Sequence, residues 1–204
     1  MSNRYVGKNI KRVDGLDKVT GAAKYIDDIQ LAGTLIGKIF RSDRPHARIL
    51  SIDTSKAKSL KGVKAVVTGQ DFPFNVGIYM VDQYIFAMDK VRFVGEPVAA
   101  VAAETEQIAE EALKLIKVEY EDLKPVYDVD DALAKNAPLV HENLKHYKVV
   151  NAINPEPDTN IPNHFKVRKG DPEAAFNKSF KVFEITFVVP QVQQVPVVTH
   201  GAVA

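Results

Sequence analysis

The stretch Val98-Ala99-Ala100-Val101-Ala102-Ala103 and the residues directly after it decide the fold. This continuous apolar run is typical of a short strand that is buried on both faces. Thr105 can cap a following helix, whose apolar side chains recur at helical spacing and form one stripe: Ile108, Ala109, Ala112, Leu113, Leu115 and Ile116. Val118-Glu119-Tyr120-Glu121 then alternates in polarity as a strand does. The pattern predicts an α+β domain.

Further elements are predicted before and after this stretch. Residues 1–33 read as irregular, and β-branched or aromatic content predicts strands over 34–41, 48–53, 63–68 and 90–94. A short helix capped by Thr54 or Ser55 is expected to run through Leu60, with Gly62 ending it. The aromatic-rich residues 70–90 are expected to form a connector with a role or a partner of its own.

The second half of the chain changes in composition. Asp128 is expected to cap a short helix over 129–134, and the proline- and asparagine-rich residues 151–163 read as a linker. Asp171 and Pro172 predict a helix start, and alternation predicts a strand over 181–189. The chain stops at Ala204 within an apolar segment, which we interpret as an interrupted second domain.

Composition restricts the classes of function. Lys plus Arg total 27 against 26 Asp plus Glu, so no basic excess indicates nucleic-acid binding. The 204 residues contain no cysteine, which excludes disulfides, thiolate metal sites and iron–sulfur ligation within them. No signal peptide is evident, and the longest apolar run, residues 97–103, is too short to span a membrane. A cytoplasmic location is expected.

The sequence offers few candidates for chemistry. None of the five histidines has an i, i+4 partner: His46, His141, His146, His164 and His200. His46 is expected in a polar loop with a structural hydrogen bond. The pairs Asp27-Asp28 and Asp130-Asp131 are expected to be solvated, because adjacent carboxylates usually point apart. Phosphate-binding loops and a serine-nucleophile motif are absent from the sequence.

The segment Gly95-Glu96-Pro97 lies between two predicted strands. Its simplest interpretation is a tight turn, because glycine tolerates positive φ and proline fixes the next φ. A buried Glu96 with a raised pKa would instead mark a site, and the sequence alone leaves these alternatives open.

Several segments, in this order, resemble the molybdopterin-binding large subunits of the xanthine dehydrogenase, aldehyde oxidase and 4-hydroxybenzoyl-CoA reductase family, which also includes carbon monoxide dehydrogenase. The matching segments are Arg12-Val13-Asp14 with Lys18-Val19-Thr20-Gly21, Arg41-Ser42 with His46-Ala47, Ile52-Asp53, Leu60-Lys61-Gly62-Val63, Val94-Gly95-Glu96-Pro97-Val98-Ala99, Ala103-Glu104-Thr105, and Gly170-Asp171 with Ala175-Phe176. Each motif is weak alone, but together they extend over nearly the whole chain.

The resemblance implies an α/β-hammerhead domain over residues 1–150, a linker over 151–163 and the truncated beginning of a molybdopterin-binding domain over 164–204. In this family the molybdenum-bound pterin and the base glutamate belong to downstream domains, while iron–sulfur clusters and usually FAD belong to other domains or subunits. No cofactor is therefore expected on this chain alone, and no catalytic, cofactor-binding or metal residue is assigned to it. The implied partners are the remaining molybdopterin-binding domains, iron–sulfur and FAD subunits, and a second copy through the truncated end.

The sequence departs from the family pattern near its end. Val198 stands two residues before His200, where the family commonly has glutamate. Two functions from different classes follow from the residues and the resemblance. The chain is either part of a molybdenum hydroxylase, with a structural and assembly role and no activity alone, or a non-enzymatic scaffold module of hammerhead fold. A gene remnant that no longer assembles is a third, weaker interpretation.

Overall fold

The computed structural model describes residues 4–29, 31–196 and 200–204. Contacts between residues divide the chain into two units, one over Leu35–Pro172 and the other over Met1–Thr34 together with Glu173–Ala204. The first unit holds the sheets, the main core and the cavities described below. Val198 lies outside the described residues, so its departure from the family pattern has no structural counterpart here.

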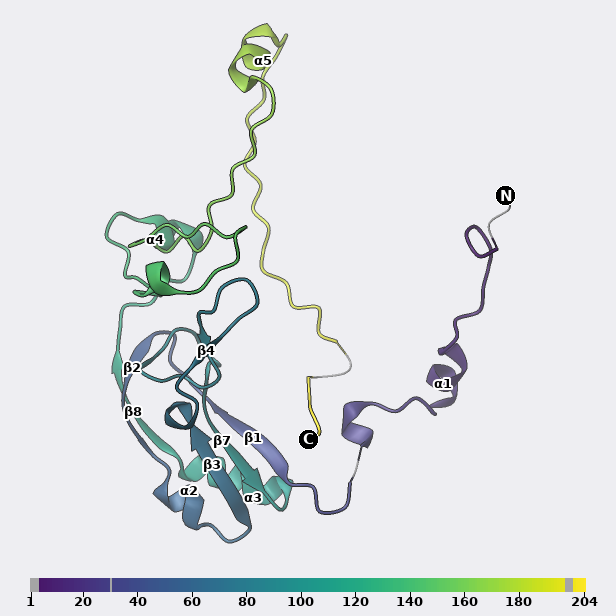
Figure 1. Ribbon diagram of the computed structural model, residues 1–204, viewed down its shortest axis with the longest axis vertical. Coiled ribbons are helices and arrows are strands. Elements are labelled where there is room, and N and C mark those ends of the chain that lie inside the picture. The colour runs from purple at the N-terminus through teal and green to yellow at the C-terminus, as the bar shows by residue number, and fades with distance from the viewer. Residues whose placement is uncertain (1–3, 30, 197–199) are drawn as a thin grey trace. The chain divides into compact units, whose positions relative to one another are not determined.

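The first sheet of the larger unit has the apolar run at its centre. Strand β7 (Pro97–Ala103) lies between β1 (Ile36–Arg41) and β3 (Val63–Thr68) and is antiparallel to both (Figure 1). The small side chains of β7 allow close packing, and Val98 and Val101 are buried. The strand predicted from the continuous apolar run is confirmed, and its central position explains why neither face is polar.

Two helices pack against this sheet. Helix α3 (Glu106–Leu115) begins where predicted, because the Thr105 hydroxyl accepts a hydrogen bond from the backbone N–H of Ile108 at 3.3 Å. Helix α2 (Ser55–Ser59) lies beside α3. The apolar side of α3 and the sheet share one core, formed by Ala57, Val66, Ala99, Val101, Ala103, Ala109, Ala112 and Ile116.

A second sheet has the order β6 (Lys90–Val91), β2 (Ala47–Asp53), β8 (Lys117–Asp122). It contributes to a smaller core made of Ala47, Ala87, Val91 and Val98. Phe40, Ile52 and Val118 pack against both cores, so the two sheets share one apolar interior. This arrangement confirms the predicted α+β class.

The predicted strand over 90–94 is shorter than expected. Strand β6 ends at Val91 because the next backbone N–H, that of Arg92, donates to the Glu96 carboxylate and not to a neighbouring strand. The connector before it is partly ordered by the 3-10 turn η2 (Gly69–Asp71) and the pair β4 (Asn75–Val76) and β5 (Gln83–Tyr84).

Residues 123–163 continue the same unit. Asp128 caps helix α4 (Val129–Leu133) as predicted, accepting from the backbone N–H of Asp131 at 2.7 Å. A 3-10 turn, η3 (Leu144–His146), follows. Within residues 151–163, the predicted linker, Glu156 and Ile161 form an isolated antiparallel bridge. The linker boundary itself stays a prediction.

The smaller unit corrects two predictions. Residues 1–33 are not wholly irregular, because α1 (Gly15–Thr20) and the 3-10 turn η1 (Ile26–Asp28) form there. Helix α5 (Pro172–Lys178) confirms the predicted start at Pro172. The strand predicted over 181–189 is wrong: no other segment among the described residues pairs with it, and a strand requires a neighbour for its backbone hydrogen bonds.

Candidate functional site

The turn between β6 and β7 buries a carboxyl group. Glu96 is 9% exposed, and its side chain accepts a hydrogen bond from the backbone N–H of Arg92. Gly95 allows the turn with a φ of 94°. Burial raises the pKa of Glu96, although the hydrogen bond and the positive charge of Arg92 oppose the rise. Both interpretations of this segment therefore hold: it forms a tight turn, and the turn buries the carboxyl group of Glu96.

Arg92 places a cation beside this carboxyl group. Its side chain is 9% exposed, and Nη1 donates to the backbone carbonyl of Lys90 at 3.2 Å. The nearest carboxylate oxygens, on Asp89 and Glu96, lie at 3.7 and 3.8 Å from its Nη2 and Nη1. Among the residues that the structure describes, Nε has no hydrogen-bond partner. The guanidinium is thus buried with several donors unused.

His141 and Tyr147 belong to the loop on the other side of this cluster. Nδ1 of His141 lies 3.1 Å from the Tyr147 hydroxyl, and the two rings meet edge to face with centroids 5.7 Å apart. Burial lowers the pKa of His141, and the charge of Arg92 lowers it further. His141 is therefore neutral at pH 7 and offers hydrogen bonds without adding charge.

Arg92, Glu96 and His141 all line one cavity of about 420 Å³. Its polar wall includes Asp82, Arg92, Glu96 and His141. Its remaining wall is formed by Gln83, Tyr84, Ile85, Phe93, Pro97 and Val140. The volume lies within the usual range for small-molecule sites, and the mixture of apolar walls with a few polar groups is typical of them.

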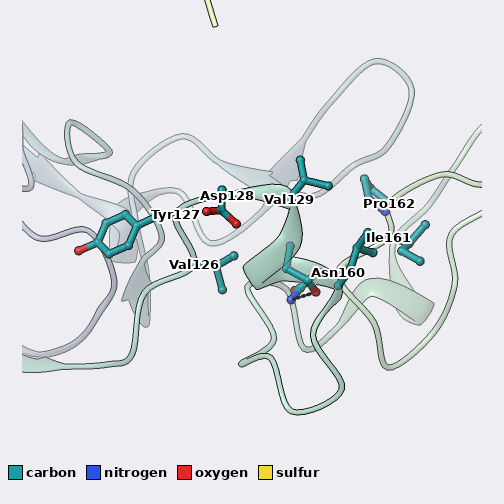
Figure 2. Close-up of a pocket in the computed structure, with 9 residues that line it drawn as sticks. Val126, Tyr127, Asp128, Val129, Asn160, Ile161 and Pro162 are labelled. Carbon is teal, nitrogen blue, oxygen red and sulfur yellow. Dashed lines mark hydrogen bonds between the residues drawn. The ribbon is translucent and has the colours of Figure 1, made fainter. Parts of the chain in front are cut away.

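A second, more apolar hollow of about 470 Å³ lies beside α4 (Figure 2). Val126, Tyr127, Val129, Ile161 and Pro162 line it. Asn160 also lines it, and its side-chain amide donates to the carbonyls of Ala132 and Pro138 while its oxygen accepts from the N–H of Val140. These three bonds account for the position of Asn160, so its role is structural.

His46 lies in the bend directly before β2, in the predicted polar loop, but its side chain is buried. It is 4% exposed, and its Nδ1 lies 2.8 Å from the carbonyl oxygen of Lys124. A carbonyl oxygen only accepts, so Nδ1 carries the proton of this bond. The predicted structural hydrogen bond is confirmed. Nε2 has no partner within the described part of the chain.

The remaining candidates are dispersed. Asp130 and Asp131 are exposed, as predicted, and Asp28 is exposed and accepts from the N–H of Tyr25. The side chain of Asp27 lies outside the described part. His164 contacts the carboxylate of Glu156, and His146 and His200 are exposed. Within residues 4–29, 31–196 and 200–204, no three His, Cys, Asp or Glu side chains are grouped so as to hold a metal ion.

The sequence indicates only Glu96 as a conditional site residue of this cavity. Arg92 and Asp82 give no signal, because each is an ordinary charged residue until the fold brings them to one wall. His141 stands in the sequence only as an isolated possible metal ligand.

Comparison with known proteins supports a specific family. Residues 20–124 match the family described as aldehyde oxidase and xanthine dehydrogenase, a/b hammerhead domain. The chain is 43% identical over 195 residues to a probable xanthine dehydrogenase component of Bacillus subtilis, covering 95% of this chain and 24% of that protein. It is 37% identical to the nicotinate dehydrogenase large molybdopterin subunit of Eubacterium barkeri, covering 89% and 40%.

Solved structures agree with the sequence matches. The Cu,Mo-CO dehydrogenase superposes with a TM-score of 0.61 at 40% identity, covering 65% of this chain and 17% of that chain. Quinoline 2-oxidoreductase from Pseudomonas putida 86 superposes with a TM-score of 0.59 at 39% identity, covering 64% and 18%. The chain therefore spans only a fraction of the length of each of these relatives.

The two small sheets, the covering helices and these matches define an α/β-hammerhead domain of the kind found in molybdenum hydroxylases. The chain belongs to the aldehyde oxidase and xanthine dehydrogenase family of oxidoreductases. Of the helices in the described part, none combines the length and the apolar character needed to cross a bilayer.

Proposed function

We propose that this chain is the amino-terminal part of a molybdenum hydroxylase large subunit, with a structural and assembly role and no activity alone. The observation that carries the proposal is the asymmetry of the match: 95% of this chain aligns with 24% of the Bacillus subtilis relative. The rest of that relative has no counterpart among these 204 residues.

The exposed apolar side chains support an assembly role. Phe180, Phe183, Phe187 and Val188 are each more than half exposed within the smaller unit. In the larger unit, Val129 and Leu133 on α4 and Tyr127 just before it are exposed. Exposed apolar side chains that are this numerous along one segment are typical of regions that are covered by another polypeptide.

We propose the domain division given by the resemblance: a hammerhead domain over 1–150, a linker over 151–163 and the beginning of a molybdopterin-binding domain over 164–204. The proposed partners are the remaining molybdopterin-binding domains and the iron–sulfur and FAD subunits. We also propose a cytoplasmic location, in line with the cysteine-free sequence.

The molybdenum cofactor is proposed for the complete enzyme. The described residues of this chain contain no ligand group for a protein-bound metal, and no residue is assigned to the pterin. We therefore derive no catalytic step from this chain. When bound in the complete enzyme, the cofactor would supply the oxidation–reduction chemistry for which the relatives are named.

The test is reconstitution. The chain is purified alone and together with a second polypeptide that carries the unmatched part of the Bacillus subtilis relative, both from cells that make molybdopterin. The expected result is that the two copurify and that molybdenum, measured by mass spectrometry, is found only in the complex. Stoichiometric molybdopterin on the isolated 204 residues would overturn the proposal.

The scaffold alternative rests on the connector between β3 and β6, where Phe74, Ile78 and Tyr79 are exposed. A scaffold predicts stable capture of a partner that binds no molybdenum, and it predicts that the unmatched part of the relative is not retained. Substitution of Ile78 and Tyr79 by serine then abolishes capture, whereas in the hydroxylase complex the second polypeptide stays bound through the remaining surface.

A further inference from the structure

The cavity beside the Gly95 turn contains polar groups that the fold itself leaves unused. Asp82 is half-buried on its wall, and its carboxylate has no hydrogen bond or ion pair among the described residues. A carboxylate only accepts hydrogen bonds, and none of the described residues donates one to Asp82. The Asp82 carboxylate is therefore free to accept from a donor placed inside the cavity.

Arg92 has hydrogen-bond donors that lack acceptors in the part of the chain that the structure describes. Its guanidinium group has five N–H donors, but Nη1 makes its one hydrogen bond of ordinary length, to the Lys90 carbonyl, and the neighbouring carboxylates lie at 3.7 and 3.8 Å. The side chain is 9% exposed and lines the cavity. A buried guanidinium with donors to spare calls for an acceptor from the same space.

The charges around the cavity decide which acceptor fits. The lining carries two carboxyl groups, on Asp82 and Glu96, and one cation, Arg92, while Lys90 outside the lining is paired with Glu142. An anionic ligand would add to this negative excess, so a carboxylate or phosphate is disfavoured. A cation would satisfy Asp82 but would be repelled by Arg92 and leave its donors unused.

We propose that this cavity binds a neutral carboxamide group. Its carbonyl oxygen accepts from the Arg92 guanidinium, and its N–H donates to the Asp82 carboxylate. Neutral His141 adds a hydrogen-bonding group without charge, because its pKa is lowered. Ile85, Phe93, Pro97 and Val140 offer apolar contact to the rest of the ligand.

The volume limits the size of the ligand. A cavity of about 420 Å³ holds one aromatic or aliphatic ring with its amide substituent, and it is near the lower end of the usual range for ligand sites. The amide can belong to a small molecule or to a peptide bond of another polypeptide, and both present the same carbonyl and N–H pair.

Three probes of one shape and different charge test the proposal. Benzamide, benzoate and benzylammonium are titrated separately into the full 204-residue chain, and backbone amide shifts are followed by NMR. Benzamide is expected to shift residues 82–85, 92–97 and 140–141 and to bind at least about tenfold more tightly than either ion, a difference of one well-placed hydrogen-bonded pair. Equal or tighter binding of benzoate or benzylammonium overturns the proposal, as does failure of both benzamide and the peptide amide described below to shift these residues.

Variants identify the groups that bind. Asp82→Ala is expected to weaken benzamide binding about tenfold. Glu111→Ala removes an exposed carboxylate on α3 that does not line the cavity, and it should leave binding unchanged. Both variants should keep the native spectrum elsewhere. Equal affinity of Asp82→Ala and the unchanged chain would contradict the assignment of Asp82 as the acceptor.

The source of the amide is separated by a fourth probe. N-acetylglycine N-methylamide carries peptide bonds without a ring. If it binds more tightly than benzamide, the cavity takes a polypeptide segment, and if it binds more weakly, the cavity takes a small carboxamide. Both results support carboxamide binding, whereas failure of both amides overturns it. Neither outcome depends on molybdenum loading, so this test is independent of the reconstitution above.

Discussion

The ammonium group of Lys90 lies 2.6 Å from the carboxylate of Glu142, although the two residues are 52 positions apart in the chain. Lys90 is almost fully buried, with 5% of its side chain exposed, while Glu142 remains half-exposed. Lys90 also donates to the carbonyl of Leu139 at 3.3 Å. This pair joins the start of strand β6 to the loop that carries His141, and so it holds two walls of the cavity together.

Glu142→Gln should destabilise the chain by about 1–3 kcal/mol, because it leaves a buried ammonium without its counter-charge. Urea unfolding measures the change. Glu121→Gln is the matched control, because the Arg48–Glu121 pair has the same 2.6 Å separation but is half-exposed on both sides. Its cost should be below about 1 kcal/mol. Equal costs for the two substitutions would show that burial of Lys90 adds nothing.

The stability of the chain should depend on the ionisation of Glu96. Its pKa is raised on folding above the ordinary value of 4.5, so the folded state holds the proton more tightly than the unfolded state does. The contribution of Glu96 to stability is therefore fully present below pH 4.5 and is lost as the pH rises through the raised pKa. Glutamine does not ionise, so Glu96→Gln avoids the cost of a buried charge. The variant should therefore gain stability relative to the original chain as the pH rises.

Glu142 gives the opposite pH dependence and serves as the control. The hydrogen bond from Lys90 lowers the pKa of Glu142 despite the opposing effect of burial. Its contribution is present above the ordinary pKa and is lost as the pH falls through the lowered value. The free energy of unfolding is measured for each glutamine variant and for the original chain between about pH 3 and 7. The difference between variant and original chain should change with pH in opposite directions for the two variants, and a change in the same direction would refute the assignment.

Two glycines with positive φ should differ in their tolerance of a side chain. Gly62 has a φ of 92°, and a Cβ added there would lie 2.6 Å from Cδ1 of Ile108 on α3. Gly95 has a φ of 94°, and its added Cβ would meet no atom within 4 Å. Gly95→Ala should cost about 1–2 kcal/mol from backbone strain alone, and Gly62→Ala should cost more. Thermal unfolding compares them directly, and a larger cost at Gly95 would contradict this ranking.

Hydrogen exchange should separate the core from the apolar segment near the end. Backbone amides of β7 are expected to exchange slowly, because the strand is bonded on both sides and buried. Residues 181–196 have no strand or helix and expose most of their apolar side chains, so they should exchange quickly. Uniformly slow exchange over 181–196 in a monomer, measured by mass spectrometry, would show that this segment has a partner strand.

The sequence predicts those elements whose cause is local. The cap at Thr105, the stripe of α3 and the apolar run of β7 each act within about ten residues, and each is confirmed. The strand over 181–189 is wrong because alternation shows only that a segment can pair, and pairing requires a second segment. The early end of β6 depends on the side chain of Glu96, which competes with a neighbouring strand for one backbone N–H.

The cavity is less predictable than the fold. Glu96 stands out because glycine and proline flank it, but its burial depends on sheets formed by distant segments. Arg92, Asp82 and His141 come from three separate loops, and no short-range pattern relates them. Their chemistry arises only from their shared surroundings, in particular the charge excess and the removal of water.

The central position of β7 also sets an order for synthesis of the chain. Strands β1 and β3 are complete by residue 68, but both pair with β7, which is finished only at Ala103. Strand β2 likewise awaits β6 and β8. On the ribosome, these early strands therefore emerge without partners and expose apolar side chains until the middle of the chain arrives, which makes this interval the time when a chaperone is most useful.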